Sequence, residues 1–272
     1  MQYTHEFFGE LIGTFILVFF GCGSVAVTVL FSAHAGLFQV AAVWGMGVML
    51  AIYATRHLSC AHLNPAVSVA MVLGRRMSAR RLPVYVGAQF IGAFLAAALL
   101  YALFSGSILA YEAVHGIVRG TPESVQTAMM FGEFYPNPGA GSVAVVSFWN
   151  AFGAEAAGTF LLVIMIFALT EGCNVGRPDD ALAPLFIGIT VAAIICVVAP
   201  LTQAGLNPAR DLGPRLFAWL AGWDRAALPD DQYGFITIYV LAPLVGGSAA
   251  SLLFVRFLEP MLSKKNNCSC CD

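Results

Sequence analysis

The tripeptide Asn64-Pro65-Ala66, within Ser59-Cys60-Ala61-His62-Leu63-Asn64-Pro65-Ala66-Val67, recurs as Asn207-Pro208-Ala209 in the second half of the chain. Asn is a preferred N-cap, and Pro is favoured at the first helical position because its missing N–H is not needed there. Each tripeptide therefore predicts the start of a helix. Apolar sequence precedes both, so these helices should begin at membrane depth, where a helix end needs protein or a water-filled cavity around it. We interpret the pair as the lining of a pore.

The composition is that of a membrane protein. Of the 272 residues, 59% are hydrophobic and 10% charged, and the mean hydropathy is +0.81. Soluble domains carry about 25% charged residues. The net charge of -2 and the lack of a basic patch with interleaved aromatics exclude a nucleic-acid-binding protein. The N-terminal residues 1–6 lack the basic region of a cleaved signal peptide, so the first apolar segment is expected to remain in the mature protein.

Six apolar stretches are long enough to cross a hydrocarbon core as helices, which takes about 20 residues. They are residues 7–30, 38–55, 82–104, 149–169, 183–198 and 235–257. The apolar pieces 67–73 and 212–219, which follow the tripeptides, are too short to span and fit half-helices. The expected fold is an all-α membrane protein of six transmembrane helices and two half-helices. It forms one channel domain over residues 1–262, with a disordered tail at 263–272.

Basic residues in the short loops predict the orientation. Arg75, Arg76, Arg80 and Arg81 lie between spans two and three, Arg177 between spans four and five, and Lys264 and Lys265 after span six. With six spans, all of these and both termini fall on one side, which should be the cytoplasm. The long loop 105–148 then lies outside. Loops of this length are often functional vestibules or lids, although many are merely peripheral.

The two halves of the chain repeat. The segment Glu10-Leu11-Ile12-Gly13-Thr14-Phe15 matches Glu155-Ala156-Ala157-Gly158-Thr159-Phe160, and Gly92 in span three corresponds to Gly246 in span six. The halves cover about residues 6–104 and 149–257. Because three spans per half is an odd number, the second half must be inverted, which places its special residues near the membrane midplane. The half-helices should then enter from opposite faces with their N-termini facing each other.

Glu10 and Glu155 are intramembrane carboxylates, which are costly and usually functional. One interpretation is a proton or ion relay. The other is structural, with each carboxylate accepting hydrogen bonds from the non-helical backbone that leads into a half-helix. We favour the structural interpretation because the residue occupies the same place in both halves of the repeat.

The tripeptides in these contexts, the second continuing as Arg210-Asp211-Leu212-Gly213-Pro214, resemble the aquaporin and glycerol-facilitator family, also called the major intrinsic protein family. The resemblance covers nearly the whole chain. Asp211 directly after Arg210, the run 214–223 and the run 118–125 look like the glycerol-conducting branch. The resemblance implies a passive channel for small neutral solutes, chiefly glycerol with some water, without a cofactor or bound metal. It also implies a homotetramer in the plasma or inner membrane.

The resemblance also implies roles for single residues. Asn64 and Asn207 would present amide N–H groups to the solute at the pore centre, and Asp211 would give structural support. Carbonyl acceptors would come from the segments before the tripeptides, namely Cys60, Ala61, His62, Leu63, Gln203, Ala204, Gly205 and Leu206. His62 could instead be a ligand or a proton carrier, but a fixed hydrogen-bonding residue is the preferred interpretation. Trp44, Ile195, Ala204 and Arg210 would form the outer constriction, which sets selectivity.

Two of these filter positions depart from bacterial glycerol facilitators, which place an aromatic residue where Ala204 stands and Gly where Ile195 stands. The set Trp44, Ile195, Ala204 and Arg210 looks more like the filter of plant nodulin-26-like channels. The solute could therefore be glycerol, another small polyol, urea or a neutral metalloid hydroxide. We expect Ala204→Phe to narrow the pore.

Two other classes of function stay open from the sequence. Inverted repeats and broken helices also build ion-coupled secondary transporters, although Glu10 and Glu155 are the only deep acidic candidates. An intramembrane enzyme would need a nucleophile with a base partner, and the spans offer none. Cys268, Cys270 and Cys271 in the tail could bind metal, carry a lipid or sense redox state, but a reduced, disordered end is the simpler interpretation.

Overall fold

The computed structural model describes residues 3–141, 143–228 and 234–266. Within these ranges six helices are long and apolar enough to cross a membrane, and no strand is present. Five of them are continuous α-helices: α1 (Thr4–Phe31), α2 (Leu37–Ser59), α4 (Leu82–His115), α6 (Phe148–Thr170) and α7 (Ala183–Thr202). The all-α fold class with six spans is therefore confirmed.

The sixth span is helical throughout but changes its winding twice. It consists of α9 (Gly234–Ile236), the π-turn Thr237–Leu241, α10 (Ala242–Leu253), the π-turn Phe254–Leu258 and α11 (Glu259–Asn266). Hydropathy alone reports the apolar length of such a segment and gives no signal for a π-turn. The predicted tail cysteines Cys268, Cys270 and Cys271 lie outside the described residues.

Two half-helices follow the tripeptides, α3 (Pro65–Leu73) and α8 (Pro208–Ala218). Both begin at the proline, with the preceding asparagine in an extended conformation as the N-cap. The remaining elements are short: the helix α5 (Val125–Ala128), the 3₁₀-turns Ala79–Arg81, Pro122–Ser124, Pro138–Ala140 and Asp224–Ala227, and the π-turn Trp219–Trp223.

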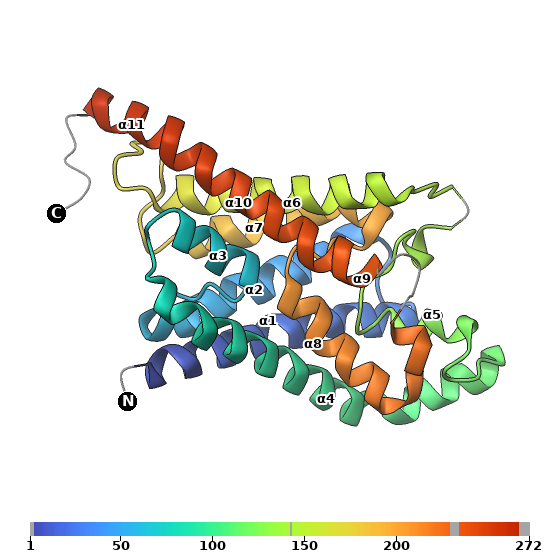
Figure 1. Ribbon diagram of the computed structural model, residues 1–272. Coiled ribbons are helices and arrows are strands. Elements are labelled where there is room, and N and C mark those ends of the chain that lie inside the picture. Colours follow the sequence, from blue (N-terminus) through green and yellow to red (C-terminus); the bar gives the residue numbers. More distant parts are fainter. Residues whose placement is uncertain (1–2, 142, 229–233, 267–272) are drawn as a thin grey trace.

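The helices pack in the same way in both halves. α1 contacts α2 and α4, and α6 contacts α7 and α10, while α2 and α7 join the halves. Each half-helix packs on the third span of the other half, α3 on α10 and α8 on α4. In Figure 1 the start of α1 and the end of α11 lie at one end of the bundle, and α5 in the long loop lies at the other. Both ends of the described chain are therefore on the same side.

Glycines in register permit the closest helix contacts. A Cβ on Gly92 would lie 2.2 Å from the Leu11 carbonyl oxygen, and a Cβ on Gly246 would lie 2.0 Å from that of Ala156. These two contacts are equivalent in the repeat, since they join the third span to the first span in each half. Small residues allow this approach, which brings the backbones close enough to pack without side chains between them.

The third span is longer than expected. The sequence predicts its end at residue 104, but α4 continues to His115 and is capped by Gly116 in a left-handed conformation. The extension is less apolar than the span, so hydropathy does not detect it. It is held in place by Arg119, which forms an ion pair with Glu112 at 2.8 Å and lies 4.0 Å above the ring of Trp223. The first part of the predicted outer loop is therefore helix.

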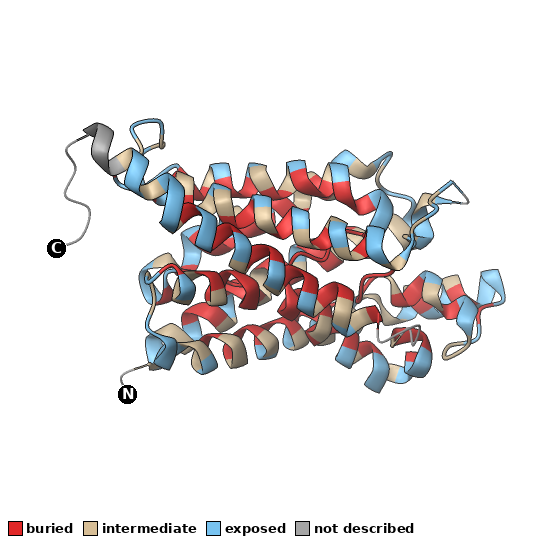
Figure 2. Ribbon diagram, turned by 45° about the horizontal axis from the view of Figure 1, so that its top comes forward, coloured by how far each residue is buried: buried red, intermediate tan, exposed pale blue. Residues whose placement is uncertain are grey.

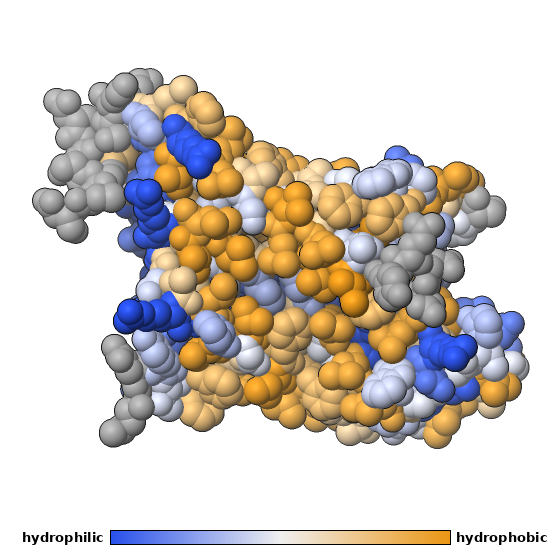
Figure 3. All heavy atoms as spheres, viewed as in Figure 1, coloured by the Kyte–Doolittle hydropathy of each residue, from blue (hydrophilic) through white to orange (hydrophobic). Residues whose placement is uncertain are grey.

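Apolar side chains cover the middle of the molecule. Figure 3 shows hydrophobic residues across the central part of one face and hydrophilic residues gathered towards its two ends. Large apolar side chains on the spans are exposed, among them Phe38, Leu103 and Val197. The buried residues concentrate between the helices (Figure 2). A surface of this kind belongs in a bilayer, where exposed apolar side chains contact lipid tails, so the chain is an integral membrane protein.

Candidate functional site

The two half-helices meet at their N-termini in the middle of the molecule. Asn64 Oδ1 accepts a hydrogen bond from the Ala66 N–H at 2.8 Å, and Asn207 Oδ1 accepts from the Ala209 N–H at 3.0 Å. Each asparagine thereby caps its own helix. Asn207 Nδ2 donates to the Leu63 carbonyl at 2.7 Å, and Asn64 Nδ2 donates to the Leu206 carbonyl at 2.9 Å. These reciprocal bonds fix the two helix ends against each other.

The segment before each tripeptide is held in an unusual conformation. Cys60, Ala61 and Leu63 have positive φ angles, as do their counterparts in the second half, Gln203, Ala204 and Leu206. Non-glycine residues rarely adopt such angles, which cost of order 1–3 kcal/mol each and persist only where the surroundings enforce them. The same strained pattern occurs in both halves, which indicates that the surrounding structure holds each segment in this conformation.

Buried carboxylates accept hydrogen bonds from these segments. Glu10 accepts hydrogen bonds from the His62 N–H at 2.9 Å, the Leu63 N–H at 2.7 Å and the Ser59 hydroxyl at 2.8 Å. Gln89 also donates to Glu10, at 2.7 Å. The carboxylate is fully buried, so its position is set by these donors.

Glu155 does the same in the second half. It accepts from the Gly205 N–H at 2.9 Å, the Leu206 N–H at 2.7 Å and the Thr202 hydroxyl at 2.6 Å.

His62 has a separate set of contacts, with its Nδ1 atom 3.2 Å from the Ser68 hydroxyl and its ring 4.9 Å from that of Tyr85.

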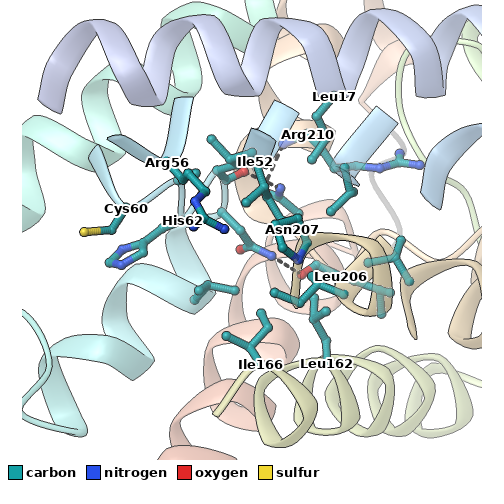
Figure 4. A pocket seen from close by; sticks show the side chains of 18 of the residues that line it. Leu17, Ile52, Arg56, Cys60, His62, Leu162, Ile166, Leu206, Asn207 and Arg210 are labelled. Carbon is teal, nitrogen blue, oxygen red and sulfur yellow. Dashed lines mark hydrogen bonds between the residues drawn. The ribbon is translucent and has the colours of Figure 1, made fainter. Parts of the chain in front are cut away.

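A cavity of about 430 Å³ passes beside the two asparagines. In Figure 4, Cys60, His62 and Arg56 lie on one side of Asn207, and Arg210 lies on the other. The spans contribute apolar side chains to its lining: Leu17, Val48, Ile52, Leu162, Ile166, Ile187 and Val191. The half-helices and the segments that precede them contribute Cys60, Ala61, His62, Leu63, Asn64, Ala204, Gly205, Leu206 and Asn207. The lining of the cavity therefore combines apolar side chains with the polar groups of these segments.

The four residues expected at the outer constriction, Trp44, Ile195, Ala204 and Arg210, all line this cavity. The Arg210 guanidinium lies 4.0 Å above the ring of Trp44. Gln203 is different, since it is absent from the lining of the cavity in the described structure. Its side chain accepts from the Phe134 N–H at 2.8 Å and donates to the Met129 carbonyl at 3.4 Å, which ties it to the outer loop.

Glu133 is a site residue that the sequence analysis missed. It comes from the long outer loop, is 3% exposed, and forms an ion pair with Arg210. Its backbone N–H donates to Asp211 Oδ1 at 2.8 Å, and its carbonyl accepts from Arg215 Nη2 at 2.5 Å. One signal for it exists in the sequence, because a lone carboxylate between Phe131 and Phe134 is unusual in a solvated loop.

Arg56 and Arg76 also line the cavity. From the sequence, Arg76 served only to predict the orientation, and Arg56 was not singled out. Arg56 donates to the Asp180 carbonyl at 2.6 Å. Arg76 forms an ion pair with Glu171 and lies 4.3 Å above the ring of Phe167. These contacts fix the loop between α6 and α7 beside the cavity.

Comparisons with known proteins agree with this geometry. The family model of the major intrinsic proteins matches residues 1–254. The glycerol uptake facilitator protein of Haemophilus influenzae is 42% identical over 263 residues, which cover 96% of each chain. The propanediol uptake facilitator PduF of Salmonella typhimurium is 38% identical over 264 residues, 97% of this chain and 96% of the relative.

Among solved structures, the X-ray structure of the aquaglyceroporin from Plasmodium falciparum matches with a TM-score of 0.83 and 26% sequence identity. The match covers 96% of this chain and 99% of that one. The match of the family model over nearly all of the chain, together with the paired asparagine caps, identifies the chain as a member of the major intrinsic protein family.

Proposed function

We propose that this protein is a passive membrane channel for glycerol and other small neutral polar solutes, and that it is not an enzyme. The observation that carries the proposal is the pair of asparagine-capped helix ends that face each other beside an amphipathic cavity. The names of the relatives support it, since they are uptake facilitators for glycerol and for propanediol.

The centre of the pore accounts for the exclusion of cations. Each helix N-terminus carries roughly half a positive charge, and α3 and α8 direct two of them at one point. A cation or a hydronium ion meets this positive potential there. A neutral hydroxyl instead accepts a hydrogen bond from Asn64 or Asn207, which carry two side-chain N–H donors each. Water molecules oriented in this way cannot relay a proton through the centre.

The two walls of the cavity suit a polyol. The N–H groups of His62, Leu63, Gly205 and Leu206 are bonded to Glu10 and Glu155. The carbonyls of these segments are then the groups that serve as acceptors for hydroxyls along the polar wall. The C–H side of the solute faces the apolar wall. An ion would lose hydration without compensation there, which costs far more than the passage of a neutral molecule.

The outer constriction is proposed to consist of Trp44, Ile195, Ala204 and Arg210. Arg210 offers a planar fork of donors for hydroxyls, and Trp44 provides an apolar wall. Ala204 leaves more space at its corner than an aromatic residue would, and Ile195 fills another corner. A propanediol is therefore a second candidate solute, as the name of the Salmonella relative suggests.

The finer assignments follow from the resemblance and the loop charges. We infer a single channel domain over residues 1–262 that assembles as a homotetramer in the inner membrane, with both termini in the cytoplasm. Asn64 and Asn207 form the pore centre, and Glu10, Glu155 and Asp211 support it.

The proposal is tested with purified protein in proteoliposomes, by light scattering after exposure to gradients of glycerol, 1,2-propanediol, urea and sorbitol. We expect glycerol and propanediol to enter much faster than in protein-free vesicles, and sorbitol to stay outside. Glycerol entry at the rate of protein-free vesicles would refute the function. Fast urea entry with slow glycerol entry would instead favour the nodulin-26-like interpretation of the filter.

A further inference from the structure

A second arginine lines the cavity towards the end of the bundle where the start of α1 and the end of α11 lie, here called the inner end (Figure 1). This residue, Arg56, belongs to the last turn of α2 and donates to the Asp180 carbonyl in the loop between α6 and α7. Arg76 marks the same end, because it contacts Glu171 at the start of that loop and lies 3.9 Å from Glu259, the first residue of α11. Arg56 therefore faces the cavity at its inner end.

Arg56 and Arg210 lie on opposite sides of the pore centre. Figure 4 shows them on either side of Asn207, and both line the cavity. A guanidinium stays protonated and has five N–H donors. In the described part of the chain, Arg56 has no carboxylate within ion-pair distance, and its one hydrogen bond goes from Nη1 to the Asp180 carbonyl. Most of its donors are therefore available to a solute in the cavity.

The other polar side chains that line this end have donors that are already used. Arg76 is in an ion pair, the Thr170 hydroxyl donates to the Ile166 carbonyl at 2.7 Å, and His62 Nδ1 lies 3.2 Å from the Ser68 hydroxyl. Apolar lining residues lie close to these groups in the sequence: Ile52, Met71, Ile166, Ala183 and Pro184. A hydroxyl that leaves water for such surroundings pays for its lost hydrogen bonds unless a donor replaces them. Arg56 is the donor placed to do so.

We propose that Arg56 is a further specificity-determining residue of the channel, which donates hydrogen bonds to the hydroxyl groups of the solute at the inner end of the cavity. A solute with more hydroxyl groups gains more from this donor than a solute of similar size with fewer. Arg56 therefore favours glycerol over 1,2-propanediol, which has one hydroxyl less. This inference rests on the proposed function and specifies which solute the inner end prefers.

The test is the ratio of glycerol flux to 1,2-propanediol flux in proteoliposomes, after the rates in protein-free vesicles are subtracted. The two solutes are nearly equal in size, so a change in pore width alters both fluxes together, while the loss of a hydrogen-bond donor alters their ratio. In Arg56→Met, which replaces the guanidinium by an apolar chain, we expect the ratio to fall by about threefold or more, because hydrogen bonds to charged groups are the stronger ones. Water flux in the same vesicles shows that the variant is folded and open.

Two control variants separate the donor from other roles of Arg56. Tyr53 donates to the Ala181 carbonyl at 2.7 Å and so holds the same loop, but it is absent from the lining of the cavity in the described structure. Tyr53→Phe should therefore keep the wild-type ratio. Arg80→Met removes a positive charge from an exposed position in the turn that precedes α4, and should also keep it.

Arg56→Gln is the second test variant, and it decides the question if the methionine variant does not fold. It retains fewer N–H donors and no charge, so its ratio should fall in the same direction by a smaller factor. A wild-type ratio in the folded variant would overturn the inference. An equal fall in Tyr53→Phe or Arg80→Met would also overturn it, because the effect would then come from the loop or from the surface charge. Failure of the proposed function is distinct, since the wild-type protein itself would then pass neither solute.

Discussion

At the scale of the residue, the site depends on a few buried polar groups that serve two purposes. Asn64 and Asn207 cap their helices with the side-chain oxygen and fix the opposite segment with the nitrogen. The sequence alone predicts these residues, because Asn followed by Pro indicates the N-cap and the first residue of a helix. It does not predict Glu133, whose partner Arg210 lies far along the chain. A contact of that kind depends on the tertiary fold, so no spacing of residues in the sequence indicates it.

The carboxylate of Glu155 accepts hydrogen bonds from the second non-helical segment, and we propose that it holds this segment in place. In Glu155→Gln the amide nitrogen cannot accept, so at least one of the three donors, Thr202, Gly205 or Leu206, loses its partner. We expect a loss of about 1–3 kcal/mol of stability and reduced glycerol flux. The measurement is the melting temperature of the detergent-solubilised protein. Glu123→Gln, at an exposed position, is the control and should leave it unchanged. An unaltered melting temperature and flux in Glu155→Gln would contradict the structural role of this carboxylate.

Ala204 is proposed to set the width of one corner of the constriction. It is 2% exposed and lines the cavity, so Ala204→Phe should place a ring in the space used by larger solutes. We expect the flux of four-carbon polyols to fall by about tenfold or more, because steric discrimination in a closed site commonly reaches this size. Water flux should change much less, and Ala204→Ser should resemble the wild type. Unchanged erythritol flux in Ala204→Phe would show that residue 204 does not limit the width of the constriction.

At the scale of the element, the two half-helices and the glycine contacts carry the architecture. The repeated Asn-Pro-Ala and the paired Gly92 and Gly246 indicate a repeat, and the odd number of spans in each half predicts that it is inverted. The extension of α4 is not predictable in this way, because it lacks apolar character. The π-turns of the sixth span are not predictable either, because they change the winding of the helix and leave its apolar pattern unaltered.

The contact between α4 and α1 depends on the absence of a side chain at Gly92. Gly92→Ala would bring a Cβ to 2.2 Å from the Leu11 carbonyl oxygen, and forcing the helices apart should cost about 1–3 kcal/mol. Gly87→Ala in the same helix meets nothing within 4 Å, so it should gain up to about 1 kcal/mol from helix propensity. Melting temperatures of the two variants should therefore shift in opposite directions. Equal shifts would argue against the close contact.

The extension of α4 depends on Arg119. Arg119→Ala would leave Glu112, which is 5% exposed, without its ion-pair partner, and would remove the contact with Trp223. We expect a loss of about 1–3 kcal/mol, the cost of leaving a buried acceptor without one of its donors. Limited proteolysis from the outer side should then cleave the outer loop faster. Arg225→Ala, at an exposed position, should leave the rate unchanged. Equal cleavage rates for both variants would show that Arg119 does not hold the extension.

At the scale of the whole molecule, the fold was predictable and the details of the filter were not. The apolar stretches and two copies of one tripeptide predict six spans and two half-helices, and the resemblance of the sequences around the tripeptides predicts the family; the structure and the relatives confirm all three. The filter charge depends on how a long loop folds back onto α8, which local sequence does not specify. The exposed apolar side chains of the spans place the molecule in a bilayer, and the cavity beside the two asparagines is the proposed route for the solute.

The central claim is that solute passes through this cavity passively and without charge movement. The most direct measurement is glycerol flux into proteoliposomes over a wide range of gradients, with an imposed proton gradient and with an added proton ionophore. The account predicts flux that rises in proportion to the glycerol gradient, does not respond to the ionophore, and brings no proton leak. Flux that saturates at low glycerol and collapses when the ionophore dissipates the proton gradient would contradict it and identify a coupled transporter.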